Sequence, residues 1–219
     1  MRGYRPCCVR YCDRAARANG MSNKCEMHRQ RARRHGDPTQ PSIRREEWRP
    51  YAKQARRIIE RGNAEKIEAG LRRIHALLLD HCREGFTNRF HAQAGAEIAK
   101  VLENVSATEC GLTIGAMYLL QSHSPQRFVS DRGFDFALVR AFRARSSMSC
   151  GSTWDYRESR ARKWYIDLPF RTVERMALLL RESFAPFVGA LLAADRRHGD
   201  QIASVRSTLN EGFALRTLE

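Results

Sequence analysis

The stretch Cys25–Pro38 reads CEMHRQRARRHGDP and combines a Cys-x2-His pair with a run of arginines. A second pair, Cys7-x4-Cys12, lies upstream, with twelve residues between Cys12 and Cys25. Zinc takes four nitrogen or sulfur ligands in a tetrahedron, and two short-spaced pairs can each supply one edge of it. Because residues 1–40 contain almost no large apolar side chains, this spacing predicts a segment whose fold is held by a metal ion.

The predicted ligand set is Cys7, Cys12, Cys25 and His28, binding one structural Zn²⁺. Three thiolates and one imidazole leave no position for water, so the metal would contribute folding free energy and not catalysis. The spacing alone leaves Cys8 open as the first ligand, since Cys8-x3-Cys12 is also feasible. Free cysteines or a redox disulfide are the alternatives, and neither accounts for the position of His28.

The charge balance is the unusual feature of the composition. Lys and Arg number 39 against 24 Asp and Glu, which gives a net charge of +15 and a pI near 10.2. Arginine predominates, and it is the better residue for bidentate contacts with phosphate. This balance indicates a polyanionic partner, and nucleic acid is the usual one. The competing interpretation is a GC-rich genome, which raises the arginine content of every protein.

The chain shows no predicted signal for export or for the membrane. The N-terminal MRGYRPCC has no apolar stretch behind it, and no apolar run approaches the ~18 residues that a transmembrane helix needs. Four of the seven cysteines lie in the first 25 residues. In a chain without an export signal this clustering favours metal over disulfides, so we expect a cytoplasmic protein of a bacterium or a phage-infected host.

The predicted fold class is mainly α, with a small N-terminal zinc module followed by a multi-helix, bundle-like domain. The expected domains are residues 1–40 (the basic zinc module) and residues 41–219 (the helical domain), with a further boundary near 146–168 left open. The proline-containing segment Asp37–Ser42 is predicted to be a linker, with Ser42 capping the next helix.

Several residues predict where helices of the second domain begin and end. Pro50 suits a first helical position, Asn63 and Ser106 suit N-caps, and Gly85 suits a C-terminal stop. Between Ser146 and Leu168 the helical pattern fades, and a short hairpin or an ordered loop is expected. Helix resumes near Pro169, Pro186 is expected to kink or divide it, and a last helix would start after Asp200.

The pentapeptide RRHGD occurs twice, at Arg33–Asp37 and at Arg196–Asp200. In both places RRHG is predicted to close a helix, because basic residues suit the C-terminal dipole and glycine suits the left-handed residue beyond it. The repeat is therefore interpreted as structural punctuation and not as a duplicated functional element.

The first 50 residues hold 13 Arg and Lys against five Asp and Glu, a net of +8. If His28 faces the metal, the opposite side of the helix from Cys25 to His35 is rich in arginine, which suits contacts with phosphates or a major groove. The predicted nucleic-acid-binding residues, with duplex DNA as the expected partner, are Arg14, Arg17, Arg29, Arg31, Arg33 and Arg34.

A second basic set is interleaved with aromatic residues between positions 154 and 171. Aromatics among arginines can stack the bases of a single strand, but they can equally pack an irregular loop onto the helical core, and the second interpretation is preferred. The residues are Trp154, Tyr156, Arg157, Arg160, Arg162, Lys163, Trp164, Tyr165 and Arg171.

The N-terminal pattern resembles a small zinc-binding module of bacteriophage and mobile-element proteins, which often precedes an HNH endonuclease domain or a DNA-binding domain. The resemblance favours Cys7 over Cys8 as a ligand and covers only about 40 residues. Arg29 and Ala32 stand where the module tends to carry aromatics, which makes this helix more basic. The matching residues are Cys7, Cys12, Asp13, Arg14, Cys25, Met27, His28, Gln30, Arg31, Arg33, Arg34, Gly36, Asp37 and Pro38.

An HNH active site needs a general-base histidine, an orienting asparagine and ligands for a divalent ion. The tempting run is DHCREGFTNRFH, with Asp80, His81, Asn88 and His91. Only nine residues separate its two histidines, whereas a hairpin and a longer loop separate them in the HNH family. We therefore interpret these residues as polar groups at a helix junction, and no catalytic residue is predicted.

The favoured function is a phage-like or mobile-element DNA-binding protein that regulates transcription or replication and is not an enzyme. One alternative is a protein-interaction factor that docks on a host complex such as RNA polymerase. A second alternative is a divergent metal-dependent nuclease.

Overall fold

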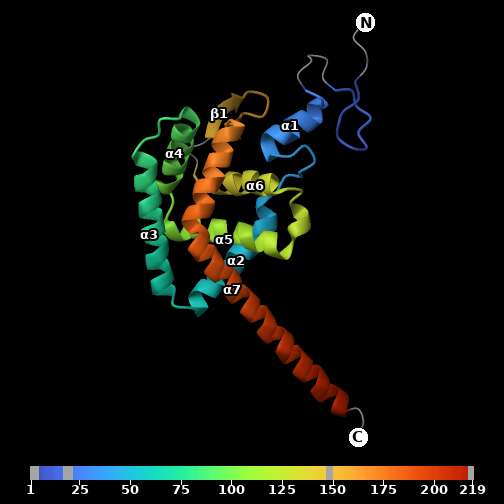
Figure 1. Cartoon of the computed structure of the whole chain (residues 1–219), viewed down its shortest axis with the longest axis vertical. Helices are drawn as coiled ribbons and strands as arrows, with labels where there is room; N and C mark the ends of the chain where they lie inside the picture. The colour runs from blue at the N-terminus through green and yellow to red at the C-terminus, as the bar shows by residue number, and fades with distance from the viewer. Residues whose placement is uncertain (1–4, 17–21, 147–149, 217–219) are drawn as a thin grey trace.

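The computed structural model describes the backbone of residues 5–16, 22–146 and 150–216, and the side chains of these residues except 150–153, 162–165 and 199–216. Its elements confirm the mainly-α class (Figure 1). The helices are α1 (Glu26–His35), α2 (Arg45–Arg61), α3 (Ala64–Arg83), α4 (Arg89–Leu102), α5 (Ala107–His123), the 3-10 turn η1 (Pro125–Arg127), α6 (Asp131–Arg143) and α7 (Phe170–Arg216), and the strands are β1 (Cys150–Asp155) and β2 (Arg160–Tyr165).

Helix α5 is the centre of the body, and α2, α3, α6 and α7 pack around it (Figure 1). Ile114, Met117 and Leu119 are completely buried, although they point to different sides of this helix. Its glycines permit close neighbours: a Cβ on Gly111 would lie 2.6 Å from Leu71 of α3, and one on Gly115 would lie 2.6 Å from Leu191 of α7. An apolar helix that is buried all round is a core helix.

The predicted caps at Asn63 and Ser106 are confirmed. Asn63 Oδ1 accepts a hydrogen bond from the Lys66 N–H at 3.0 Å, and Ser106 Oγ accepts one from Glu109 at 3.3 Å. Gly85 has a φ of +86° just beyond α3, as its predicted role as a stop requires. Asn63 and Ser106 satisfy backbone N–H groups that a helix start leaves without a partner. Gly85 supplies the left-handed conformation that ends a helix.

The start of α2 differs from the prediction. The helix begins at Arg45, Arg44 is its N-cap in place of Ser42, and Pro50 lies inside the helix. The backbone N–H of Arg44 donates to the Glu47 carboxylate at 2.8 Å, which stabilises a first turn that begins five residues before Pro50. Pro50 is exposed, and a proline inside a helix removes one intrahelical hydrogen bond.

Helix α7 is a single element, so no new helix starts after Asp200, and of the two expectations at Pro186, a kink or a division, the division is wrong. A proline inside a helix costs about 3 kcal/mol because it removes one hydrogen bond and crowds the preceding turn. Pro186 is on the exposed side, and the buried side chains of Phe184 and Val188 hold the helix against the core on either side of it.

The two copies of RRHG have different roles. In the first copy Gly36 ends α1 with a φ of +78°, and its N–H donates to the carbonyl of Ala32, as predicted. The second copy, Arg196–Gly199, lies inside α7 and ends no helix. The prediction of helix punctuation is therefore correct for the first copy and wrong for the second.

The segment Phe170–His198 is long enough and apolar enough, by length and composition alone, to cross a membrane. In the structure it packs against α3, α4, α5 and α6, and Met176, Leu180 and Phe184 are fully buried there. One apolar face of this segment is thus buried against other helices of the protein, as in an ordinary core helix.

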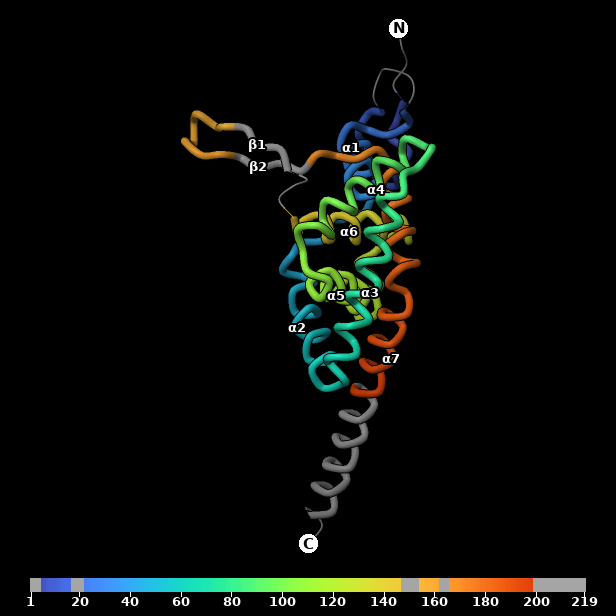
Figure 2. Tube along the Cα trace, turned by 90° about the vertical axis from the view of Figure 1, so that its left-hand side faces the viewer, coloured from blue at the N-terminus to red at the C-terminus, as the bar shows by residue number. Residues whose placement is uncertain are grey.

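Strands β1 and β2 form the predicted hairpin, an antiparallel pair in which Trp154 is opposite Ala161. The loop of the hairpin stands away from the helices (Figure 2). Trp154 is 56% exposed and Tyr156 is 86% exposed, so the expectation that these aromatics pack onto the core is wrong for both. The side chains of Arg162, Lys163, Trp164 and Tyr165 lie outside the described residues, whereas Arg171 is exposed at the start of α7.

The segment Asp37–Ser42, predicted to be a linker, is held against the body. Gln40 is almost completely buried, its amide Nε2 donates to the Arg127 carbonyl at 2.9 Å, and its Oε1 accepts from the Val129 N–H at 2.9 Å. At Gly36 an added Cβ would lie 2.7 Å from the Phe136 ring. Helix α1 therefore has a defined position on α6, which matters for the surface that the two helices share.

Leu180→Ala tests the α7 contribution to the core. Because Leu180 is fully buried and its loss leaves a cavity, we expect the free energy of unfolding to fall by about 2–5 kcal/mol in urea denaturation. Leu77→Ala is the matched control, since Leu77 is 61% exposed, and we expect a change within about 0.5 kcal/mol. Equal effects of the two substitutions would contradict the described core.

Candidate metal centre and basic surface

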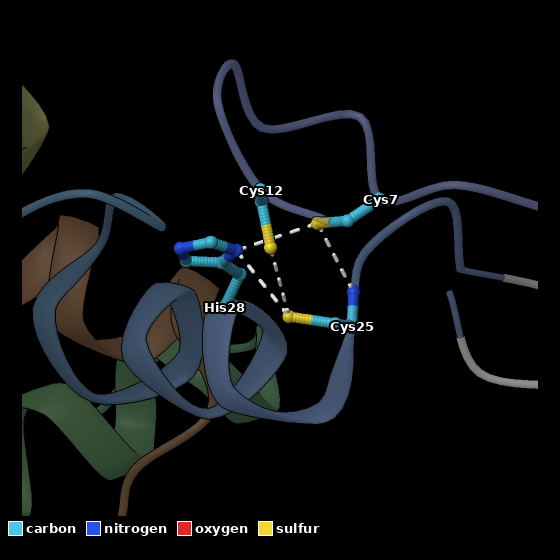
Figure 3. Close-up of side chains that lie close together, drawn as sticks. All are labelled: Cys7, Cys12, Cys25 and His28. Carbon is cyan, nitrogen blue, oxygen red and sulfur yellow. Dashed lines mark hydrogen bonds between the residues drawn. The ribbon is translucent and has the colours of Figure 1, made fainter. Parts of the chain in front are cut away.

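Four side chains from two separate segments meet in one cluster (Figure 3). The sulfur atoms of Cys7, Cys12 and Cys25 and a ring nitrogen of His28 all lie within 4.8 Å of one another. His28 Nδ1 is 3.3 Å from the sulfurs of both Cys7 and Cys25, and the Cys12 and Cys25 sulfurs are 3.9 Å apart. These residues can therefore hold a metal ion, as the two-pair spacing predicts.

Local backbone structure brings each pair into position. Cys25 is the N-cap of α1, so His28 follows it in the first turn and points to the same side. On the other segment the Cys7 N–H donates to Arg14 and the Cys12 N–H donates to Val9, which folds the Cys7–Cys12 loop back on itself. The two segments are joined by a hydrogen bond from the Cys8 N–H to the Asn23 carbonyl at 2.8 Å.

The alternative between Cys7 and Cys8 is decided by the fold. Cys7 and Cys25 are buried with His28, while the Cys8 side chain is exposed and is not part of the cluster. The Cys8 backbone contributes only the link to Asn23. Cys7 thus belongs to the candidate ligand set, and Cys8 serves as a natural internal control.

The thiols of Cys7 and Cys12 have pKa values shifted in opposite directions. Burial raises the pKa of Cys7, but N–H groups of Cys25 and Val9 and contacts with His28 and the Cys25 side chain outweigh it, so the pKa falls from 9.0 to about 6. The pKa of Cys12 is raised. A backbone hydrogen bond at Arg14 lowers it, but burial and the neighbouring sulfurs of Cys25 and Cys7 together raise it by more. A cation bound among the three sulfurs would favour their thiolate forms, because its positive charge offsets the repulsion between neighbouring thiolates.

The predicted nucleic-acid-binding arginines fall into two groups on α1. Arg29 forms a bidentate pair with Glu26, with N–O distances of 3.1 and 2.7 Å, and Arg33 pairs with Asp167 at 3.3 Å. A four-residue spacing places Arg29 and Arg33 along one edge of the helix. This edge is therefore partly neutralised by acids of the same protein, which the sequence pattern did not predict.

Arg31 and Arg34 occupy another edge of α1, since they are three residues apart. Both are exposed, and no acidic partner is found for them among the described residues. Arg14 is exposed and donates to the Met27 sulfur at 3.4 Å, whereas Arg17 lies outside the described residues. The edge with Arg31 and Arg34, called the free edge below, is the part of the predicted surface that keeps its full charge.

The free edge faces further basic residues that the sequence analysis did not connect with it. An open cavity of about 600 Å³ between α1 and α6 is lined by Arg34 and Arg140, among other residues. His35, half-buried beside it, has its pKa lowered from 6.5 by burial and by the positive charges of Arg140, Arg34 and Arg31, which together outweigh the opposite effect of Asp167. Arg140 is visible in the sequence next to an apolar helical stretch, but its approach to α1 requires the tertiary structure.

The run that resembled an HNH site has structural contacts at a helix junction. The Asn88 side chain caps α4 by accepting from the N–H groups of Phe90 and His91. His81 lies 3.5 Å from Glu84 and makes an edge contact with Phe86. These contacts are those expected of polar residues between two helices.

Comparison with known proteins adds no family to this description. The chain matches none of the protein-family models, none of the curated proteins and none of the solved structures. The function must therefore be argued from the cluster and the charged surface themselves.

Replacing Cys25 tests the metal centre. Because Cys25 contributes a buried sulfur to the cluster, Cys25→Ser should lose the bound metal and make the segment before Pro38 sensitive to limited proteolysis. Metal content measured by elemental mass spectrometry and the cleavage pattern are the readouts. Cys8→Ser is the control, because its side chain is exposed outside the cluster. Metal loss in both variants, or in neither, would contradict the assignment.

Proposed function

We propose that this protein is a zinc-containing DNA-binding protein of the phage or mobile-element type, regulatory and not enzymatic. The proposal is carried by one observation: a cluster of three cysteines and a histidine at the start of a helix whose free edge presents Arg31 and Arg34. The metal would hold that helix together with the preceding loop, and the arginines would contact phosphate.

Zinc is the ion that best suits the donor set. Thiolates with one imidazole are the ligands of structural zinc sites, and Zn–S bonds of about 2.3 Å in a tetrahedron imply ligand separations of roughly 3.8 Å. The separation of 3.9 Å between the sulfurs of Cys12 and Cys25 is close to this value. With four protein donors no coordination position is left for substrate, which supports a structural role and not a catalytic one.

The position of the charge supports a polyanionic partner for the same region. Residues 1–50 hold 13 Lys and Arg and five Asp and Glu, so they carry +8 of the net charge of +15. Two of the arginines on α1 are paired with acids of the protein, whereas the residues that the structure describes include no acidic partner for the free edge. Arginine forms bidentate contacts with phosphate, and such contacts position a protein on a duplex without reading its sequence.

The double substitution Arg31→Glu with Arg34→Glu tests this proposal. We expect affinity for a 20-base-pair DNA duplex, measured by fluorescence anisotropy, to fall roughly tenfold or more, and the slope of log K against log salt to become shallower by about 2. The wild-type slope should be roughly −4 to −5, as four to six phosphate contacts imply. Bound zinc should stay at one equivalent.

The control is Arg72→Glu with Arg83→Glu on α3, which changes the net charge by the same amount at exposed positions at the edge of the body away from α1 (Figure 1). Equal loss of affinity in the two double variants would show that only net charge matters. A wild-type protein that binds no duplex at low salt would rule out the proposed function. Capture of a protein complex that survives nuclease treatment would then favour a protein-interaction factor.

A further inference from the structure

We propose that the phosphate-binding surface is not confined to the zinc module but continues across the helical body as one strip of six residues. This basic strip runs from α1 over α6 to α2. The inference rests on the proposed function and deepens it, because it names the surface that would follow the backbone of a duplex. The basic strip consists of Arg31, Arg34, Arg140, Arg45, Arg49 and Lys53.

The first link joins α1 to α6. Arg34 and Arg140 line the same open cavity of about 600 Å³, and Arg140 is exposed. Asp167 lines this cavity too, where it is paired with Arg33. After burial, the positive charges of Arg140, Arg34 and Arg31 lower the pKa of His35, and Asp167 opposes them. Three like charges so close together are unfavourable in the free protein, and an anion bound among them would remove that repulsion.

The second link joins α6 to α2. A smaller cavity of about 230 Å³ is lined by Arg140, Arg45 and Arg145. Arg145 forms an ion pair with Glu109, so it is not counted in the strip. Arg140 thus lines both cavities and connects the free edge of α1 with the first residue of α2.

The third link runs along α2. Arg45, Arg49 and Lys53 are four residues apart, so they lie along one side of the helix with a rise of about 6 Å per step. All three are exposed, and no acidic partner is found for them among the described residues. Glu46 is exposed three residues before Arg49 and so flanks the same side of the helix, but no ion pair between Glu46 and a strip residue is found among the described residues.

Several arginines next to the strip are paired within the protein and are therefore not counted in it. Arg29 and Arg33 on α1 are bonded to Glu26 and Asp167, and Arg56 on α2 is paired with Glu109. Arg143 is buried, with its guanidinium bonded to Glu97 and to the Ile166 carbonyl. Several arginines beside the strip are thus neutralised by acids of the protein, whereas no acidic partner of the six strip residues is found in the described part of the chain.

The strip is also preformed. The contact of Gly36 with Phe136 and the buried amide of Gln40 hold α1 in place against α6 and the turn before it. Binding would therefore not require the two parts to come together first, which reduces the entropy cost of association.

A duplex fits this surface better than an acidic protein does. B-DNA carries one negative charge per about 1.7 Å of its axis, so a strip that spans three helices can meet several phosphates. Stable protein interfaces instead have an apolar or aromatic centre with charges at the rim. All six members of the strip are cationic.

The deciding variant is Arg45→Glu with Arg49→Glu, which lies outside the zinc module. Relative to the Arg72→Glu, Arg83→Glu control, affinity for the 20-base-pair DNA duplex should fall roughly tenfold, and the salt slope should become shallower by about 2. Zinc content and the urea midpoint should stay at the wild-type values, because both residues are exposed and an acid near the start of α2 suits the helix dipole.

The outcomes separate this inference from the proposed function. If Arg31→Glu with Arg34→Glu weakens binding but the α2 variant behaves like the control, the strip is wrong and the zinc-module interface stands. If the wild-type protein binds no duplex, both the proposed function and the basic strip are wrong. An equal loss on a duplex RNA of the same sequence assigns the strip to phosphate of either duplex, and a loss confined to DNA assigns it to DNA.

The His35 side chain supplies a second readout that does not depend on affinity. Phosphates over Arg34 and Arg140 would offset the charges that lower its pKa, so saturating duplex should raise the pKa of His35 measured by NMR titration. A His35→Gln variant assigns the signal. An unchanged pKa in the saturated complex would remove the junction of α1 and α6 from the interface.

Discussion

The close contact between the end of α1 and α6 determines how the two parts of this protein are arranged. Gly36 ends α1 in a left-handed conformation and comes so close to Phe136 that a Cβ would clash with its ring. Gln40 then fills a buried position and satisfies a donor and an acceptor in the turn before α6. Because buried polar groups need partners, this contact specifies one geometry and makes the zinc module part of a common surface with the helical body.

That geometry also decides which charges are available to a partner. Asp167 precedes α7 and reaches Arg33 on α1, while Glu26 takes Arg29 within the same helix. Arg31 and Arg34 keep their charge, and α6 adds Arg140 beside them. The proposed interface is thus produced by selective pairing within the protein as much as by the number of arginines. An excess of positive charge by itself attracts a polyanion, but its distribution sets how the polyanion lies.

The body that carries this surface is built on a helix with no exposed stripe. Helix α5 is buried all round because neighbouring helices cover every side of it. Small residues such as Gly111 and Gly115 let α3 and α7 approach closely. The continuity of α7 through Pro186 follows from the same packing, because buried residues on both sides of the proline keep the helix continuous despite the missing hydrogen bond. Tertiary contacts here override a strong local signal, as they often do for helix propensity.

The sequence by itself determined the features that depend on neighbouring residues. The Cys-x4-Cys and Cys-x2-His spacings identified the cluster, and Asn63, Ser106 and Gly85 marked helix ends, because ligand pairs and caps act over a few residues. Only the tertiary structure decided between Cys7 and Cys8, kept α7 whole through Pro186, and placed Arg140 beside Arg34. These outcomes depend on burial and on contacts between segments far apart in the chain, and neither is encoded in local spacing.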